Sequence, residues 1–161
     1  MRPTMKVSFV GEFFEKPRYQ GGGSSHINAF RITSAQEALA DYGHGSYSKG
    51  FNIDSDKTDD NLLAEALLTA KESDVCVIFA GLPERAESEG FDRKHLRLPD
   101  NQNTLISEIA KIQYNCVVVL YNGSPVEMPW LNEVAAVLEM YLGGEAVGGA
   151  TADIKSRKKL Q

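Results

Sequence analysis

Hydrophobic residues along this chain gather in short continuous runs, which alternate with stretches of helical periodicity. The runs lie in Lys6–Gly11, Asp74–Gly81 and Asn115–Tyr121, with weaker ones at Tyr47–Phe51 and Val134–Tyr141. Continuous apolar runs rich in β-branched residues are typical of strands buried on both faces, and such burial favours parallel pairing. The pattern therefore predicts a mostly parallel sheet.

Helical stretches separate these strands. Thr33 is expected to cap a helix that reaches Tyr42, Asp59–Glu72 and Asn101–Ile112 have apolar residues at helical spacing, and Gly143–Gly149 opens a short terminal helix. Alternation of buried strands with amphipathic helices predicts helices on both faces of the sheet, which is a three-layer α/β sandwich.

Three long connections leave the strands at one edge of this sheet: Glu12–Ile32, Leu82–Pro99 and Asn122–Trp130. Loops of this length in compact domains are often functional, and open parallel sheets bind ligands beyond the carboxyl ends of their strands. We therefore expect a functional site where these loops meet.

The composition excludes several classes of protein. The 161 residues are 42% hydrophobic and 24% charged with a net charge of −5, which excludes a disordered chain and argues against a nucleic-acid partner. The apolar runs are too short to cross a membrane, and the absence of a visible signal peptide predicts a cytoplasmic location. Cys76 and Cys116 are expected to be buried thiols, and the scattered histidines predict neither a metal nor a cofactor.

The first loop carries Gly21–Gly23 followed by Ser24 and Ser25. Consecutive glycines let backbone N–H groups approach a ligand closely, so this segment suits a phosphate or a sugar. It lacks the spacing of a dinucleotide-binding or P-loop motif, and a flexible loop without a ligand is the alternative.

The second loop is dense in charge. Its ionisable residues are Glu84, Arg85, Glu87, Glu89, Asp92, Arg93 and Lys94. One interpretation is a solvated cluster in which an Asp92–Arg93 pair fixes the turn. The other is an acid/base site, in which a half-buried carboxyl stays protonated near neutral pH. Glu89 fits the second interpretation best, because Gly90 allows a sharp turn that projects the carboxyl.

The third loop contains Trp130, the one tryptophan of the chain, shortly after the turn Asn122-Gly123. The tryptophan either fills the edge of the core or presents its face to a sugar ring.

Three segments together carry a resemblance. Val10–Asn28 (VGEFFEKPRYQGGGSSHIN), Gly81–Asn103 (GLPERAESEGFDRKHLRLPDNQN) and Val118–Ile154, from VVLYNGSPVEMPW through YLGGEAVGGATADI, occur in the order and spacing of one family. They resemble the C-terminal α/β sandwich of bacterial β-glucosidases in glycoside hydrolase family 3. The resemblance implies a flavodoxin-like fold over residues 5–154, with residues 1–4 and 155–161 as cloning-derived or truncated ends.

The family hydrolyses β-glycosidic bonds with retention, by a nucleophilic aspartate and a general acid/base glutamate. The resemblance implies that Glu89 is the acid/base, with Glu87 as a weaker alternative, and that Asp92 and Arg93 support the loop. It further implies that one wall of the substrate cleft, on the aglycone side, is formed by Arg18, Gly22, Gly23, Ser24 and Ser25.

The family's nucleophile lies in a preceding (β/α)₈ barrel, which these 161 residues do not contain. We therefore expect an inactive domain whose partners are a β-glucoside and the barrel, and whose apolar docking face promotes self-association. Two other hypotheses stay open: a standalone sugar- or phosphate-binding module without catalysis, and an interaction protein without ligand chemistry.

Overall fold

The computed structural model describes residues 5–40, 45–90 and 92–156, and side chains as far as residue 153. Within these residues the sheet has five strands in the order β2-β1-β3-β4-β5, and every neighbouring pair is parallel. The strands are β1 Val7–Val10, β2 Ser46–Ser48, β3 Val75–Gly81, β4 Cys116–Tyr121 and β5 Ala136–Glu139. The predicted parallel sheet is confirmed.

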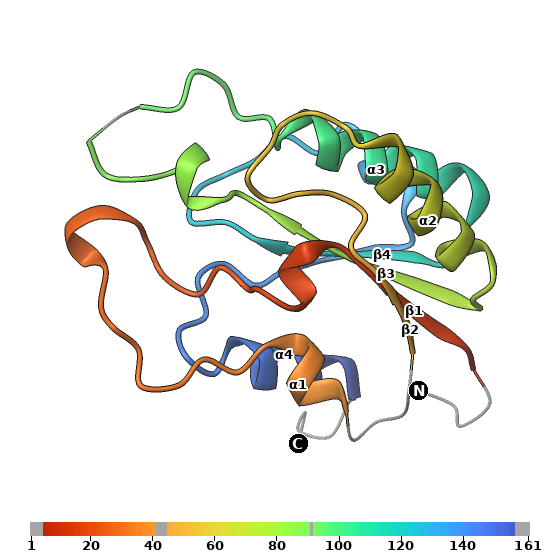
Figure 1. The fold of residues 1–161 in the computed structure, drawn as a ribbon, viewed down its shortest axis with the longest axis horizontal. Coiled ribbons are helices and arrows are strands. Elements are labelled where there is room, and N and C mark those ends of the chain that lie inside the picture. The colour runs from red at the N-terminus through yellow and green to blue at the C-terminus, as the bar shows by residue number, and fades with distance from the viewer. Residues whose placement is uncertain (1–4, 41–44, 91, 157–161) are drawn as a thin grey trace.

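The helices cover both faces of the sheet and complete three layers. They are α1 Ala35–Leu39, α2 Asp60–Lys71, α3 Asp100–Ile112 and α4 Val147–Ser156. Helices α2 and α3 lie together on one face, and α1 and α4 lie together on the other (Figure 1). Short 3₁₀ turns lie in the connections after the strands: η1 Glu12–Phe14 and η2 Gly23–Ser25 after β1, η4 Glu84–Ala86 after β3 and η5 Leu131–Glu133 after β4.

The core forms around the two central strands. From Cys76 to Gly81 every residue of β3 is buried, and in β4 only Val117 is not fully buried. This burial on both faces is the reason why these strands are continuous in apolar residues rather than alternating. Cys76 and Cys116 face each other in register on the two strands and are buried cysteines outside any disulfide, as expected.

Some element boundaries differ from the predicted ones. Ser34 caps α1, because its hydroxyl accepts a hydrogen bond from the Glu37 N–H at 3.1 Å, whereas the N–H of Thr33 donates to Glu145 instead. The predicted end of this helix at Tyr42 lies outside the described residues. Strand β2 ends at Ser48, because the backbone then turns and the Phe51 N–H bonds the Lys49 carbonyl at 2.8 Å.

Helix α4 is longer than predicted. It begins at Val147 and continues to Ser156, so it includes Lys155, which the sequence assigned to a terminal tail. In the part of the chain that the structure describes, no helix is long and apolar enough to span a membrane.

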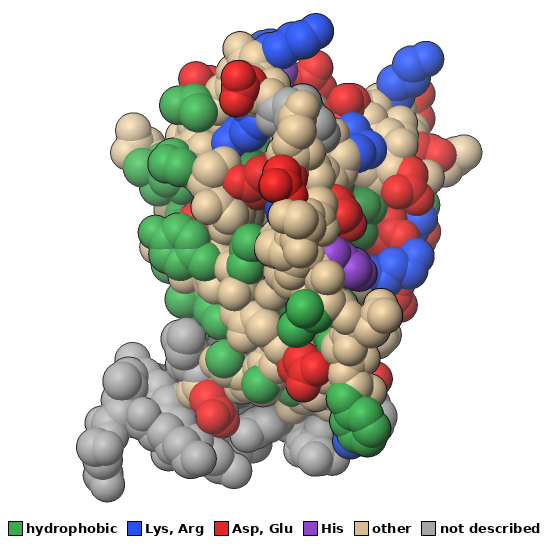
Figure 2. Space-filling model, turned by 90° about the vertical axis from the view of Figure 1, so that its left-hand side faces the viewer, with side chains coloured by type: hydrophobic (Ala, Val, Ile, Leu, Met, Phe, Trp, Pro, Cys, Tyr) green, Lys and Arg blue, Asp and Glu red, His purple; other side chains and the backbone are tan. Residues whose placement is uncertain are grey.

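The three long loops leave the sheet on one side, where they form the edge drawn at the left of Figure 1. Seen face-on, this edge carries acidic and basic side chains near its middle and hydrophobic side chains along one flank (Figure 2). The fold thus brings together the segments in which the sequence places its candidate chemistry.

Candidate functional site

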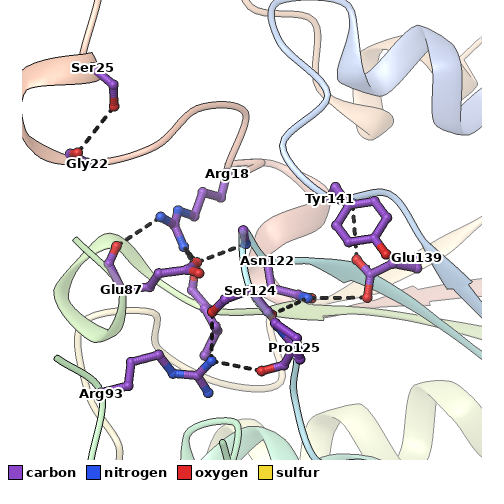
Figure 3. A network of polar contacts seen from close by, with 12 residues as sticks. Arg18, Gly22, Ser25, Glu87, Arg93, Asn122, Ser124, Pro125, Glu139 and Tyr141 are labelled. Carbon is purple, nitrogen blue, oxygen red and sulfur yellow. Dashed lines mark hydrogen bonds and ion pairs between the residues drawn. The ribbon is translucent and has the colours of Figure 1, made fainter. Parts of the chain in front are cut away.

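A buried ion pair joins the first loop to the second. The side chain of Arg18 is only 7% exposed, and its Nη1 forms an ion pair with Glu87 Oε2. The same Nη1 donates to the Leu82 carbonyl at 3.0 Å, and Nη2 donates to the Glu87 carbonyl at 2.9 Å. Arg18 therefore binds both the side chain and the backbone of the acidic loop (Figure 3).

The third loop contacts the same carboxylate. The N–H of Gly123 donates to Glu87 Oε2 at 2.8 Å, and the Ser124 hydroxyl also bonds the Glu87 carboxylate. Ser124 Oγ in turn accepts a hydrogen bond from Arg93 Nη1 at 2.8 Å, and the Pro125 carbonyl accepts another at 2.9 Å (Figure 3). All three loops thus meet at Glu87.

These contacts decide the protonation of Glu87. Burial alone would raise the pKa of this carboxyl, but hydrogen bonds from Ser124, Gly123 and Arg18 and the Arg18 charge outweigh burial and lower the pKa. A carboxylate held ionised in this way is a poor proton donor near neutral pH. The geometry therefore disfavours Glu87, the weaker of the two predicted acid/base candidates.

The same contacts change the role expected for Arg18. The sequence indicated a cleft wall that touches substrate, whereas the structure buries the guanidinium and directs its donors to Leu82 and Glu87. The Arg18 Nε atom is buried without a hydrogen-bond partner among the described residues. Arg18 fastens the loops, and it also lines a pocket beside them together with Tyr19 and Glu84.

Glu89 lies on the rim, next to the glycine loop. Its Oε2 accepts a hydrogen bond from the Ser24 N–H at 2.5 Å, and the Ser24 hydroxyl bonds the same carboxylate. Two of the predicted cleft residues, Gly22 and Gly23, therefore lie directly against the acidic loop. The expected neighbourhood of Glu89 and the glycine triplet is present.

Glycine is required at position 23 for two reasons. Its φ of +83° is a conformation that other residues rarely adopt, and a Cβ atom there would lie 2.4 Å from the Cβ of Glu89. Gly22 is similarly confined, since a Cβ would lie 2.6 Å from Ser88 Oγ. The glycines allow the two loops to touch, in addition to freeing backbone N–H groups.

The electrostatics of Glu89 differ from the expectation. The side chain is exposed, and the hydroxyl and N–H of Ser24 lower the pKa of its carboxyl. The described residues therefore favour the ionised form of Glu89. Proton donation at neutral pH requires an environment that the described residues do not supply.

The two predicted supporting residues behave differently. Arg93 contacts the third loop through Ser124 and Pro125, which agrees with a supporting position. Asp92 is exposed, and among the described residues no ion pair joins it to Arg93. The turn is therefore held by Arg93 and the third loop, not by an Asp92–Arg93 pair. Ser25 stays within its own loop, where its hydroxyl donates to the Gly22 carbonyl at 3.3 Å.

The sequence did not indicate a second polar cluster at this edge. Glu139 ends β5, and its carboxylate accepts hydrogen bonds from Asn122 Nδ2 at 3.2 Å and from the Tyr141 N–H at 3.1 Å. Burial raises the pKa of Glu139, and the two hydrogen bonds oppose that rise only in part. Tyr141 has a φ of +53°, unusual for a non-glycine residue. A charged residue at the end of an apolar strand was the available signal.

Trp130 belongs to the core. It is fully buried, and its indole N–H donates to Asn103 Oδ1 at 3.0 Å, so it has no face free for a sugar ring. Among the described residues, no cluster of three or more histidine, cysteine, aspartate or glutamate side chains has the arrangement of a metal site.

Comparison with known proteins identifies the family. The model of the glycosyl hydrolase family 3 C-terminal domain matches residues 1–156. The chain belongs to this family. Thermostable beta-glucosidase B of Acetivibrio thermocellus is 51% identical to this family 3 domain over 158 residues, which are 96% of this chain and 21% of that protein. An exo-alpha-(1->6)-L-arabinopyranosidase of Bifidobacterium breve is 46% identical over 151 residues, or 92% of this chain and 20% of that protein.

A solved structure confirms the fold of the family 3 domain. The family 3 beta-glucosidase of Bifidobacterium adolescentis superposes with a TM-score of 0.87 and 46% identity, over 92% of this chain and 22% of that one. The family 3 domain described here thus spans about a fifth of the length of these relatives.

Proposed function

We propose that this domain supplies the general acid/base, Glu89, of a retaining β-glycosidase of the β-glucosidase type, together with part of its substrate cleft. The observation that carries the proposal is that two neighbouring carboxylates have different surroundings. Glu87 is committed to a buried ion pair, whereas Glu89 is exposed on the rim beside the glycine loop. Membership of family 3 and the names of the relatives support the reaction class.

The chemistry needs a second carboxyl group. Retaining hydrolysis places two carboxyl groups about 5–5.5 Å apart across the scissile bond, one to attack the anomeric carbon and one to protonate the leaving oxygen. In the proposed enzyme Glu89 protonates that oxygen and later activates water. The nucleophile comes from the (β/α)₈ barrel outside this domain, so the isolated chain is inactive.

Contact with the barrel domain would also account for the protonation of Glu89. Approach of a second carboxylate and exclusion of water both raise the pKa of a carboxyl group. Both effects act against the Ser24 contacts that keep Glu89 ionised in this chain. We infer that the acid/base becomes a competent proton donor only when the barrel closes the cleft.

Exposed apolar side chains on the loops suit such a partner. Phe30 is 99% exposed, and Ile27 and Tyr141 are also largely exposed. They belong to neighbouring segments, because the Phe30 N–H donates to Glu145 Oε1 at 2.9 Å. We propose that this strip contacts the rest of the enzyme, and that it causes self-association when the domain is alone.

Sugar preference is proposed to reside outside this domain. Relatives named as a beta-glucosidase and as an arabinopyranosidase share 51% and 46% identity with it over nearly the whole chain. We infer that the domain contributes the acid/base to either sugar, and that the barrel selects the glycone.

A chimera tests the proposal. This chain would replace the matched segment of the Acetivibrio thermocellus enzyme, and hydrolysis of aryl β-glucosides would be measured. We expect an active chimera, and we expect Glu89→Gln to lower kcat by about 10²–10⁴-fold for a poor leaving group. For dinitrophenyl glucoside, whose leaving group needs no proton, kcat/KM should fall much less, whereas kcat should still fall because Glu89 also activates water in the second step.

The control variant is Glu108→Gln, on α3, whose one ion pair among the described residues is with Lys111. It should leave kcat unchanged. Full activity of the Glu89→Gln chimera on both substrates would refute the proposal. Calorimetry of the isolated chain with cellobiose and with inorganic phosphate tests the alternative of a standalone binding module. Saturable binding that Gly23→Ala abolishes would support that alternative.

A further inference from the structure

We propose that Arg18 and Glu87 are a positioning pair, which fixes the backbone of the acidic loop so that Glu89 meets the glycine loop. This inference rests on the proposed role of Glu89, and the experiment below separates the two. The pair itself does not touch the reacting atoms.

Three separate loops meet at the Glu87 carboxylate. Glu87 lies in the second loop, Arg18 in the first and Gly123 in the third, and Glu87 Oε2 bonds both partners. The residues of the ion pair are 69 positions apart in the chain. A single carboxylate therefore holds three segments that approach each other only in the folded state.

Arg18 also binds the backbone of the second loop. Arg18 Nη1 bonds the carbonyl of Leu82, just after β3 ends, and Nη2 bonds the carbonyl of Glu87. These two carbonyls bracket the turn η4. A planar guanidinium with several fixed donors can hold both ends of a turn at once, which a lysine ammonium on a flexible stem does poorly.

Glu87 lies only two residues before Glu89 in the chain. Glu87 has an extended backbone with φ −148° and ψ 102°. Two residues of extended chain span roughly 7 Å, so fixing Glu87 leaves Glu89 little freedom. The Ser24 contact with Glu89 then completes a second attachment of the same loop to Gly23 and Ser24. Without the ion pair, this exposed contact would have to hold the loop alone.

Nuclear magnetic resonance of the whole 161-residue chain tests the inference. The Ser24 amide signal and the Glu89 carboxyl signal would be followed against pH in the native chain and in Arg18→Met. We expect the native Ser24 amide to shift as Glu89 titrates. In Arg18→Met this coupled transition should be lost, and the pKa of Glu89 should return towards its ordinary value.

The matched control is Glu12→Gln. Glu12 is also a buried carboxylate of the first loop, paired with Lys16 and Lys49 and bonded by the Ile53 N–H at 2.8 Å. Its loss should reduce stability but leave the Ser24 and Glu89 titration unchanged. Equal effects of Glu12→Gln and Arg18→Met on that titration would overturn the inference, because they would show a general loosening.

Arg18→Lys serves if Arg18→Met does not fold. It keeps the charge but loses the planar fork, and we expect the same change in part. An unchanged Ser24–Glu89 titration in the folded Arg18→Lys chain would also overturn the inference. In the chimera, Arg18→Lys should lower kcat by about tenfold or more and shift the alkaline limb of its pH profile, which the proton donor Glu89 sets. If Glu89→Gln leaves the activity of the chimera unchanged, the proposed function is refuted. The effect of Arg18 on the Ser24–Glu89 titration would still hold.

Discussion

Glu87 and Glu89 are two carboxylates of the same loop, two positions apart, and their surroundings differ in almost every respect. Glu87 is largely buried, paired with a buried arginine and bonded by two further donors. Glu89 is exposed, and among the residues that the structure describes only Ser24 bonds its carboxylate. One carboxylate fixes the loop, and the other is presented by it.

The comparison shows how a surface loop gains both order and reactivity. A buried, fully bonded charge resists a change of protonation, because that change would break the contacts that hold the loop. An exposed carboxylate can change its protonation without disturbing the fold. The loop therefore separates the two tasks between side chains on one short stretch of backbone.

Arg18→Met should have the largest effect on stability, because it removes the cation that pairs with Glu87. It leaves Glu87 buried without its cation, and removing one partner of a buried ion pair costs about 3–5 kcal/mol. Urea denaturation should show a loss of unfolding free energy towards the lower end of that range, since Glu87 keeps 17% of its side-chain surface exposed. Glu89→Gln should lower the denaturation midpoint much less, because its contact with Ser24 is exposed.

The double variant Arg18→Met/Glu87→Met sharpens this result. Replacing both partners with apolar residues of similar size leaves no unpaired charge, so it should recover much of the stability lost in Arg18→Met. A double variant as unstable as Arg18→Met would show that the backbone bonds of Arg18, rather than its charge pairing, dominate.

Gly23→Ala tests the contact between the loops. A side chain in the left-handed region costs about 1–2 kcal/mol, and here the added Cβ would also meet Glu89. Gly144→Ala is the matched control, because Gly144 has a φ of +70° and, apart from its chain neighbours, no described atom lies within 4 Å of the built Cβ. We expect both to lower the unfolding free energy, but only Gly23→Ala to displace the Glu89 carboxyl signal. Equal displacement by both would contradict the proposed contact.

Acid titration of stability should distinguish Glu87 from an unshifted carboxyl. Because the pKa of Glu87 is lower in the folded chain than in the unfolded chain, its stabilisation is complete above the unfolded pKa of about 4.3. It is lost as the pH falls through the folded pKa. Glu87→Gln should therefore be less stable than the native chain at pH 7, and the difference should shrink below about pH 4. A constant difference would argue against the lowered pKa.

The sequence predicted the sheet, its parallel pairing and the meeting of three loops, because buried strands and amphipathic helices leave strong periodic signals. It also predicted that Glu89 and Gly23 lie together. It could not predict that Arg18 is buried against Glu87, since nothing in a local pattern joins residues separated by 69 positions. The same limit applies to protonation, because the pKa of a carboxyl in one loop depends on contacts from the other loops.

Glu139→Gln should change the unfolding free energy least, and in the opposite direction to Glu87→Gln. Burial raises the pKa of this carboxyl in the folded chain, so its ionised form is disfavoured by folding. Its contribution to stability is present at low pH and is lost as the pH rises through the folded pKa. Relative to the native chain, Glu139→Gln should therefore gain stability between pH 4 and pH 7, whereas Glu87→Gln loses it. Urea midpoints across this range, measured in parallel, compare the two slopes. Slopes of the same sign would mean that donors at the loop junction, rather than burial, control both carboxylates at this edge of the sheet.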